Sequence, residues 1–285
     1  MRKKMKIPEL YEHKKPVFSL EIFPPKKKGN IESIYDTVEQ LAHCNPDFIS
    51  VTYGAGGNST CEIASRIKKQ YGIESVAHLT CVNSSKEDVE EMIGRLAEAD
   101  IENVLALRGD ISEDGEIKHD FHHANELAIE VQRKCRDNLE ILGACYPEGH
   151  YESKSLDEDI QNLKYKIGAG VKVLITQLFF DNEAFYKFLE KSRNAGITLP
   201  VCAGIMPITS AKQLGTTVSL SGSAVPKQLA DIIATYGDDP ADMRKAGIDY
   251  AIRQILDLKA HHADGIHIYT MNKPKVAQEI VSAIQ

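Results

Sequence analysis

The segment FSLEIFPP, residues 18–25, places a carboxylate, Glu21, inside an otherwise apolar run that has the pattern of a strand. Two prolines close the segment and end the run, because proline has no backbone N–H to give to a sheet. Glu21 is therefore expected near the C-terminal end of a strand, where a charge is costly unless it is paired or used. It serves either in a structural ion pair with Arg108 or Lys273 or as a general acid or base. Partial burial favours the protonated form, which an acid needs near neutral pH.

Polar side chains recur at the ends of the other apolar runs. Taken alone, His78 is more often a satisfied core residue than a catalyst, and Thr52 can be an ordinary β-branched strand residue. Polar residues nevertheless recur at the ends of many apolar runs, which favours one shared site over a separate structural role for each residue. In chain order these residues are Glu21, Thr52, Tyr53, His78, Arg108, Asp110, Tyr146, Glu148, Gln177, Asp181, Tyr269, Thr270, Asn272 and Lys273.

Short apolar runs rich in β-branched residues supply the elements that must position these side chains. Nearly continuous apolar runs suit strands that are buried on both faces of a parallel sheet. Helical patterns lie between them, and most strand starts are roughly 26 to 37 residues apart, the size of one βα unit. The runs cover residues 17–23, 48–54, 75–80, 103–109, 140–147, 173–180, 200–207 and 265–271.

Strands that alternate with helices in this way predict a (β/α)8 barrel, as a single domain over residues 1–285 with its core at about 16–282. An open doubly wound sheet is the alternative, and it fits less well because no G-x-G-x-x-G follows an early strand. The glycines of GAGG, at 54–57, have the wrong spacing for that fingerprint. Chemistry in a barrel gathers at the C-terminal strand ends, where the polar residues fall.

Composition narrows the classes of function. The 285 residues carry a net charge of −7, which argues against a nucleic-acid partner. No apolar run is long enough to span a membrane, and the basic start has no apolar segment typical of a signal peptide. Six scattered cysteines without a C-x-x-C pair argue against a zinc or iron–sulfur site. We therefore expect no metal ion in the protein, and we expect the protein to lie in the cytoplasm.

The motifs FSLEIFPPK, SVTYGAGG, AHLTC, LALRGD, YPEGH, ITQLFFD, GIMPI and IYTMNK occur in this order at the predicted strand ends. Any one of them is weak, but the ordered set resembles the catalytic domain of 5,10-methylenetetrahydrofolate reductase, a flavin-dependent (β/α)8 barrel. The likeness covers about residues 16–282, and nothing matches the regulatory domain of the animal enzymes. It implies reduction of methylenetetrahydrofolate to 5-methyltetrahydrofolate by hydride transfer from reduced FAD, a reaction of one-carbon metabolism that serves methionine biosynthesis.

The resemblance also implies roles for individual residues. Glu21 matches the general acid that protonates N10 of the folate and opens the ring to an N5 iminium cation. Asp110 matches a carboxylate beside the flavin pyrimidine edge and the pterin. Gln177 and Gln213 match amides that bind folate, and Lys273 stands where the well-studied bacterial enzymes have an arginine near the substrate.

The FAD-binding positions implied by the resemblance form two groups. Those that contact the flavin are Thr52, Tyr53, Ala55, His78, Arg108, Gly109, Asp110, Ala124, Tyr146 and His150. The ribose and diphosphate are held by Asp159, Asn162 and Lys166, whose i, i+3, i+7 spacing places them on one side of a helix. Without the resemblance, that helix face reads as ordinary solvated surface.

Two departures from the family pattern bear on the electron donor. Tyr165 stands where relatives have a diphosphate-binding arginine, and Thr217 stands where bacterial relatives stack a phenylalanine on substrate or nicotinamide. Some anaerobe members of the family receive electrons through a partner subunit. NADH or NADPH acting directly, or an electron-delivering partner subunit, is therefore the expected source of electrons. The chain is expected to form an oligomer.

Two other functions remain open at this point. A folate-dependent methyltransferase barrel that passes a methyl group to a corrinoid needs no flavin. A non-catalytic subunit that keeps the fold is the second, and the presence of Glu21, Asp110 and Gln177 argues against it.

Overall fold

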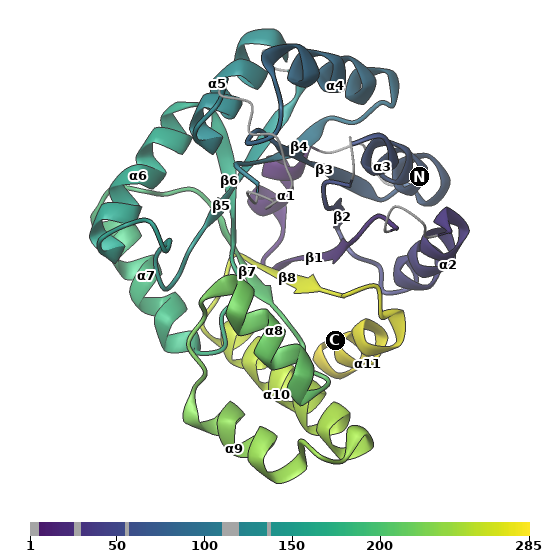
Figure 1. Cartoon of the computed structure of the whole chain (residues 1–285), viewed down its shortest axis with the longest axis vertical. Helices are drawn as coiled ribbons and strands as arrows, with labels where there is room; N and C mark the ends of the chain where they lie inside the picture. The colour runs from purple at the N-terminus through teal and green to yellow at the C-terminus, as the bar shows by residue number, and fades with distance from the viewer. Residues whose placement is uncertain (1–5, 26–29, 55–56, 110–119, 136–137) are drawn as a thin grey trace.

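The computed structural model describes residues 6–25, 30–54, 57–109, 120–135 and 138–285. Its parallel strands are hydrogen-bonded in chain order, and the last strand pairs with the first to close a barrel (Figure 1). This confirms the predicted (β/α)8 fold. The strands are β1 (Val17–Ile22), β2 (Phe48–Val51), β3 (Glu74–Thr80), β4 (Asn103–Leu107), β5 (Glu140–Cys145), β6 (Val171–Thr176), β7 (Val201–Ile205) and β8 (Gly265–Tyr269).

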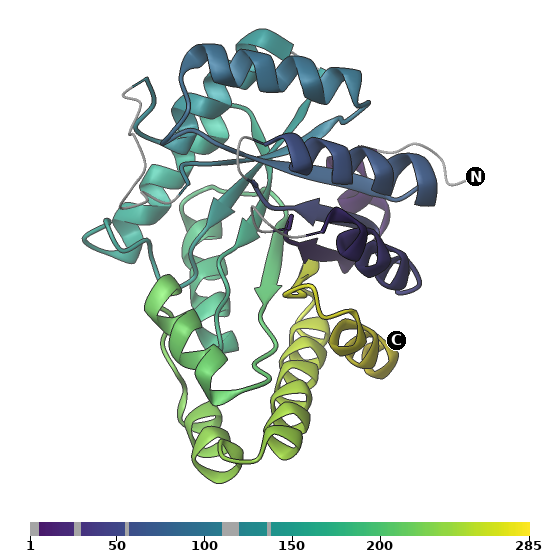
Figure 2. The same cartoon turned by 45° about the vertical axis from the view of Figure 1, so that its right-hand side comes forward.

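Helices surround the barrel, and the connection from β7 to β8 carries the additional helical pattern of the sequence. Two views show α9 and one end of α10 extending beyond the ring of outer helices (Figures 1 and 2). No helix in the described ranges has the length and apolar character needed to cross a membrane. The helices are α1 (Ile7–His13), α2 (Ile31–Ala42), α3 (Asn58–Tyr71), α4 (Lys86–Glu98), α5 (Ala124–Cys135), α6 (Leu156–Gly168), α7 (Asn182–Asn194), α8 (Ala211–Ser221), α9 (Lys227–Tyr236), α10 (Pro240–Ala260) and α11 (Pro274–Ile284).

Each strand has two buried faces, which explains the nearly continuous apolar runs. On β1, Leu20 and Ile22 pack in the large core between strands and helices, whereas Val17 packs in a second cluster inside the barrel. Successive side chains of a strand point to opposite faces. Ser19 and Glu21 therefore share the interior face with Val17, and Glu21 lies farthest toward the C-terminal end.

The short helix α1 closes the N-terminal end of the barrel. Its residues Ile7 and Tyr11 belong to the interior cluster, together with Val17, Phe48 and Cys202 from the strands. The interior is thus apolar at the N-terminal end and polar near the C-terminal end. Among the residues that the structure describes, the barrel interior therefore opens toward the C-terminal ends of the strands.

Gly204 on β7 makes room for an aromatic ring at the mouth of the barrel. A Cβ at this position would lie 2.5 Å from the Thr176 carbonyl oxygen and 2.8 Å from the Tyr269 Oη. Because glycine has no side chain, the Tyr269 hydroxyl reaches across and donates to the Thr176 carbonyl at 2.6 Å. Strands β6, β7 and β8 are thereby linked directly below the cavity.

Candidate active site

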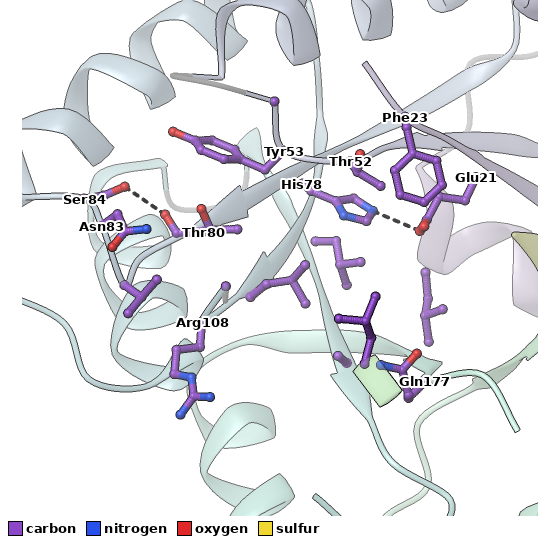
Figure 3. A pocket seen from close by; sticks show the side chains of 18 of the residues that line it. Glu21, Phe23, Thr52, Tyr53, His78, Thr80, Asn83, Ser84, Arg108 and Gln177 are labelled. Atoms are coloured by element: carbon purple, nitrogen blue, oxygen red, sulfur yellow. Dashed lines mark hydrogen bonds and ion pairs between the residues drawn. The ribbon is translucent and has the colours of Figure 1, made fainter. Parts of the chain in front are cut away.

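A cavity of about 1140 Å³ opens at the C-terminal ends of the strands (Figure 3). It exceeds the usual range of small-ligand pockets, about 300–1,000 Å³, and so has room for more than one small molecule. The predicted site residues that line it are Glu21, Thr52, Tyr53, His78, Arg108, Gly109, Tyr146, His150 and Gln177.

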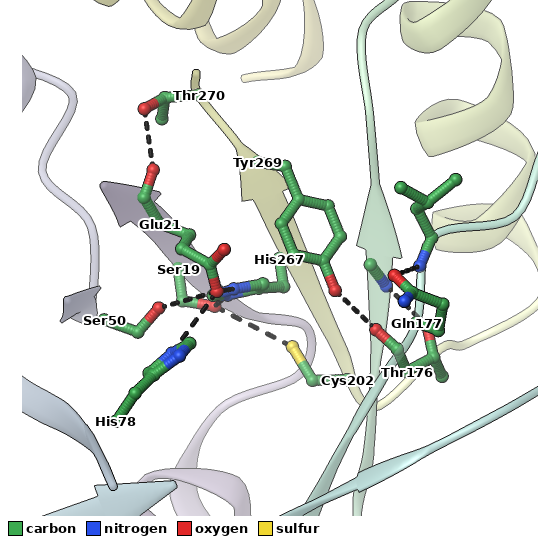
Figure 4. Close-up of polar contacts among 12 residues, drawn as sticks. Ser19, Glu21, Ser50, His78, Thr176, Gln177, Cys202, His267, Tyr269 and Thr270 are labelled. Atoms are coloured by element: carbon green, nitrogen blue, oxygen red, sulfur yellow. Dashed lines mark hydrogen bonds and ion pairs between the residues drawn. The ribbon is translucent and has the colours of Figure 1, made fainter. Parts of the chain in front are cut away.

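Glu21 lies at the floor of this cavity with 5% of its surface exposed. The Ser50 hydroxyl donates to its Oε2 at 3.2 Å, and His267 Nε2 lies 3.3 Å from the same atom. His78 Nε2 is 3.4 Å from Oε2, at ion-pair distance (Figures 3 and 4). Among the described residues, the hydrogen bonds and ion pairs of this carboxylate all go to Oε2. Oε1 is the oxygen that remains for a molecule in the cavity.

The two histidines decide the charge of Glu21. Burial by itself raises the pKa of this carboxyl, but the contacts with His267 and His78 outweigh burial and lower it from 4.5 to about 2. The expectation that partial burial keeps Glu21 protonated is therefore wrong for the protein alone. The error came from treating burial as the only influence, whereas contacts to the charged form act in the opposite direction.

The ion pairs that would have made Glu21 a structural residue do not form. Arg108 instead makes a bidentate contact with Glu152 at 2.8 and 2.6 Å, and it donates to the Tyr151 hydroxyl at 2.6 Å. Lys273 donates to the Thr209 hydroxyl at 2.8 Å. The contact with Arg108 lowers the pKa of Glu152. Arg108 is thus held at the cavity wall by side chains that follow β5.

Some polar strand-end residues are structural. Asn272 accepts from the Phe23 N–H and donates to the Phe23 carbonyl, both at 2.9 Å, which fixes the segment that follows Glu21. The Thr270 hydroxyl donates to the Glu21 carbonyl oxygen at 2.6 Å. Asp181 caps α7 by accepting from the Glu183 N–H. The inference that strand-end polar residues share one site therefore holds for only part of the set.

The helix face on α6 lies behind the cavity wall. Lys166 Nζ donates to the Ala144 carbonyl at 2.9 Å and lies 5.6 Å from the centre of the Tyr146 ring. Both Ala144 and Tyr146 line the cavity. Burial lowers the pKa of Lys166. Asp159 accepts from the Ser153 hydroxyl at 3.1 Å, and Asn162 is exposed.

The remaining predicted site residues lie elsewhere. Gln213 on α8 contacts Thr209 and the Pro207 carbonyl, and Ala124 begins α5. The residues that are described but do not line the cavity are Ala124, Asp159, Asn162, Lys166, Gln213 and Lys273. Asp110 and Ala55 lie outside the described residues. Within the described ranges there is no group of three or more His, Cys, Asp or Glu side chains that could hold a metal ion.

Sequence reasoning missed three polar residues: Ser50 and His267, which contact Glu21, and Ser19, which contacts His267. Ser19 lies two positions before Glu21, Ser50 two before Thr52, and His267 two before Tyr269. All three are buried in the barrel interior. The two-residue period of a strand puts each on the same face as its predicted neighbour. Counting back by two from the strand ends would have found them.

Comparison with known proteins adds the family. The family model described as methylenetetrahydrofolate reductase matches residues 6–285. The methylenetetrahydrofolate reductase (NADH) 1 of Arabidopsis thaliana is 32% identical over 95% of this chain and 49% of its own length. The 5,10-methylenetetrahydrofolate reductase of Pectobacterium carotovorum is 32% identical over 92% of this chain and 88% of its own length. The chain thus spans about half of the plant relative and most of the bacterial one.

A solved structure shows the same fold at lower identity. It is a Clostridium thermocellum protein described as binding two copies of 5-methyl-5,6,7,8-tetrahydrofolic acid. It aligns with a TM-score of 0.67 and 14% identity over 98% of both chains. At this identity the likeness supports the barrel architecture alone.

Proposed function

Because the chain belongs to the methylenetetrahydrofolate reductase family, we propose that it reduces 5,10-methylenetetrahydrofolate to 5-methyltetrahydrofolate with FAD as its cofactor. The observation that carries the proposal is Glu21, a buried carboxylate at the floor of a large cavity whose described contacts all go to one oxygen. That arrangement suits an acid that serves a ligand through its other oxygen.

The residues around the cavity fit FAD. The volume of about 1140 Å³ suits a cofactor and a substrate together. Aromatic side chains at the wall, Tyr146 edge-on to His150 and His150 stacked on Tyr151, offer surfaces for a planar ring. Arg108 and, behind the wall, Lys166 supply positive charge for a diphosphate. The residues that would hold FAD are Thr52, Tyr53, His78, Arg108, Gly109, Tyr146, His150, Asp159, Asn162 and Lys166.

Glu21 acts on the substrate. FAD, when bound and reduced, supplies the hydride that the reaction requires. Glu21 gives its proton to N10 of the folate, the bond between N10 and the methylene carbon breaks, and an iminium cation remains at N5. Protonation is needed because an amine nitrogen is a poor leaving group until it is protonated. The carboxylate left behind is stabilised through Oε2 by Ser50 and His267.

In this proposal Gln177 orients the folate. It lines the cavity, and its Oε1 accepts from the Leu178 N–H at 2.9 Å. Its NH₂ group is therefore the part that donates to a ligand. Electrons reach the cofactor from NAD(P)H directly or through an electron-delivering partner subunit.

The test separates the two half-reactions. Glu21→Gln keeps the size of the side chain and removes the acid. We expect the variant to bind FAD and to be bleached by dithionite like the wild type. Its reoxidation by methylenetetrahydrofolate, followed at the flavin absorbance in a stopped-flow instrument, should be slower by about 10²- to 10⁴-fold.

Reduction of a quinone by the same reduced variant is the control, since it needs no acid. Reoxidation of the variant by the folate at the wild-type rate would contradict the role of Glu21. A colourless protein that binds no added FAD and transfers a methyl group from a folate to a corrinoid would instead favour a methyltransferase.

A further inference from the structure

Beneath Glu21, inside the barrel, the contact with His267 continues to a buried serine, Ser19, that no step above uses. His267 on β8 is completely buried, and so is Ser19 on β1. His267 Nε2 lies 3.3 Å from Glu21 Oε2, and its Nδ1 lies 2.8 Å from the Ser19 hydroxyl oxygen (Figure 4). Ser19, His267 and Glu21 are thus connected through both nitrogens of one imidazole ring.

The register of the barrel sets this geometry. β1 pairs with β8 so that Ser19 is the partner of His267 and Glu21 is the partner of Tyr269. Ser19 and Glu21 are two residues apart and so face the interior together. The ring of His267 is packed between Phe48, at 6.2 Å between ring centres, and the edge of Tyr269, at 5.2 Å. Rotation of the imidazole is therefore restricted by its neighbours.

The hydrogen bonds select one tautomer of His267. An ionised carboxylate can only accept, so Nε2 must carry the hydrogen that is donated to Glu21. In the neutral ring, Nδ1 is then unprotonated and needs a donor. The Ser19 hydroxyl, at 2.8 Å, is that donor. Its other contacts are longer, 3.4 Å to the Ile266 carbonyl and 3.8 Å to Cys202 Sγ.

The cysteine and tyrosines near Ser19, His267 and Glu21 add no charge to this group of residues. Burial raises the pKa of Cys202 to about 12, and burial also raises the pKa of Tyr11 and of Tyr269 well above their usual range. These groups stay neutral near neutral pH. Glu21 is the charged group that His267 contacts directly.

From these contacts we propose that Ser19 and His267 are positioning residues for Glu21. Ser19 fixes the Nε2–H tautomer of His267, and His267 holds Oε2 so that Oε1 presents the acid proton to the cavity. The proton that leaves Oε1 is replaced from the cavity side, because His267 has no exposed surface. This inference rests on the proposed function, because Ser19 and His267 can position an acid only if Glu21 is one.

The first experiment needs no catalysis. The chain is labelled with ¹⁵N-histidine, and the ring-nitrogen shifts of His267 are measured by NMR near neutral pH, with His267→Gln used for assignment. We expect the wild type to show hydrogen on Nε2 and an unprotonated Nδ1. Ser19→Ala should shift His267 toward a mixture of tautomers, and Ser19→Cys, which keeps a weak donor, should restore part of the wild-type signal.

The matched control is Ser75→Ala. Ser75 is a buried serine on β3 whose hydroxyl has no hydrogen-bond partner among the described residues. Removing it changes packing as Ser19→Ala does, without touching the cluster. It should leave the His267 signals unchanged.

The second experiment measures the acid. Flavin-loaded Ser19→Ala should bind FAD and be reduced by dithionite normally, while its reoxidation by methylenetetrahydrofolate slows by about 10- to 100-fold. The pH dependence of that step should also move, whereas Ser75→Ala should follow the wild type. A wild-type tautomer in Ser19→Ala, or a pH profile that superimposes on that of Ser75→Ala, would overturn the proposal. Reoxidation of Glu21→Gln by the folate at the wild-type rate would count against Glu21 as the acid. That result is distinct from the outcomes for Ser19→Ala.

Discussion

At Glu21, stabilisation of the charge conflicts with the need for a proton. Its neighbours lower its pKa to about 2, yet the proposed reaction requires the protonated form. The same contacts make the acid stronger and also reduce the fraction that is protonated near neutral pH. The enzyme can work under this condition because a strong acid transfers its proton readily once it has one.

The pH dependence of the folate half-reaction follows from this lowered pKa. When an acid works above its pKa, its protonated fraction rises as the pH falls, about tenfold for each pH unit. We expect single-turnover reoxidation by methylenetetrahydrofolate to accelerate by about that factor per unit between about pH 8 and pH 6. Glu21→Gln should not show this dependence. A flat wild-type profile would mean that bound substrate raises the pKa of Glu21 above this range.

Lys166 offers a second prediction at the scale of one residue. Its ammonium is anchored on the Ala144 carbonyl behind the cavity wall. The resemblance implies that Lys166 holds the FAD diphosphate, and a charge-assisted contact of this kind would contribute roughly 1.5–3 kcal/mol. Lys166→Ala should therefore raise the dissociation constant for FAD by about 10- to 150-fold, measured by ultrafiltration and flavin fluorescence. Lys164→Ala, at an exposed position of the same helix, is the control. Equal FAD affinity in both variants would remove Lys166 from the site.

At the scale of elements, β6, β7 and β8 are connected through Gly204, whose lack of a side chain leaves room for a hydrogen bond between Tyr269 and Thr176. Gly204 lets Tyr269 reach the Thr176 carbonyl, and the Thr176 hydroxyl in turn accepts from the Gly204 N–H at 2.8 Å. Tyr269 lines the cavity and packs against the His267 ring. The packing of these three strands therefore supports the chain of contacts that ends at Glu21.

Gly204→Ala tests this coupling. The added Cβ would lie 2.5 Å from the Thr176 carbonyl oxygen, and overpacking of this kind costs about 1–3 kcal/mol. We expect a lower urea midpoint and loss of folate turnover. Gly94→Ala is the matched control, because nothing lies within 4 Å of its added Cβ and alanine favours the helix. Its midpoint should rise slightly. Equal midpoints for wild type and Gly204→Ala would show that the barrel absorbs the methyl group.

At the scale of the whole molecule, the residues of α8 near the cavity bear on how electrons reach it. Thr217, which by resemblance replaces a stacking phenylalanine, is 9% exposed and is not among the residues that line the cavity. Leu220, one turn later on α8, is 84% exposed and lines it. The cavity therefore offers a nicotinamide no aromatic ring from α8 at these positions.

We therefore expect the chain alone to use NADH weakly. Aromatic stacking contributes on the order of 0.5–1.5 kcal/mol, so the loss of one ring weakens NADH binding without abolishing it. Anaerobic mixing with NADH should bleach the flavin slowly, while dithionite bleaches it fully. Leu220→Phe should speed the NADH reaction, and Thr217→Phe should not. Fast and tight NADH oxidation by the unmodified chain would argue against the need for a partner subunit.

Local sequence patterns determined the architecture of this protein. Alternation of apolar strands and amphipathic helices, at the spacing of one βα unit, is a property of consecutive residues and predicted the closed barrel. The prolines after Glu21 placed it correctly at a strand end, next to the cavity. The helix α1, which closes the other end of the barrel, was not anticipated, because a seven-residue segment carries too little periodicity to be recognised.

Only the tertiary structure decided what surrounds Glu21. Its contact with His267 joins residues 246 positions apart, and the contact of His267 with Ser19 joins residues 248 positions apart. Both exist because β8 closes on β1 in a particular register. A pKa depends on the groups within a few ångströms of a side chain, not on its neighbours in sequence. The sequence therefore located the acid, and the closure of the barrel determined its charge.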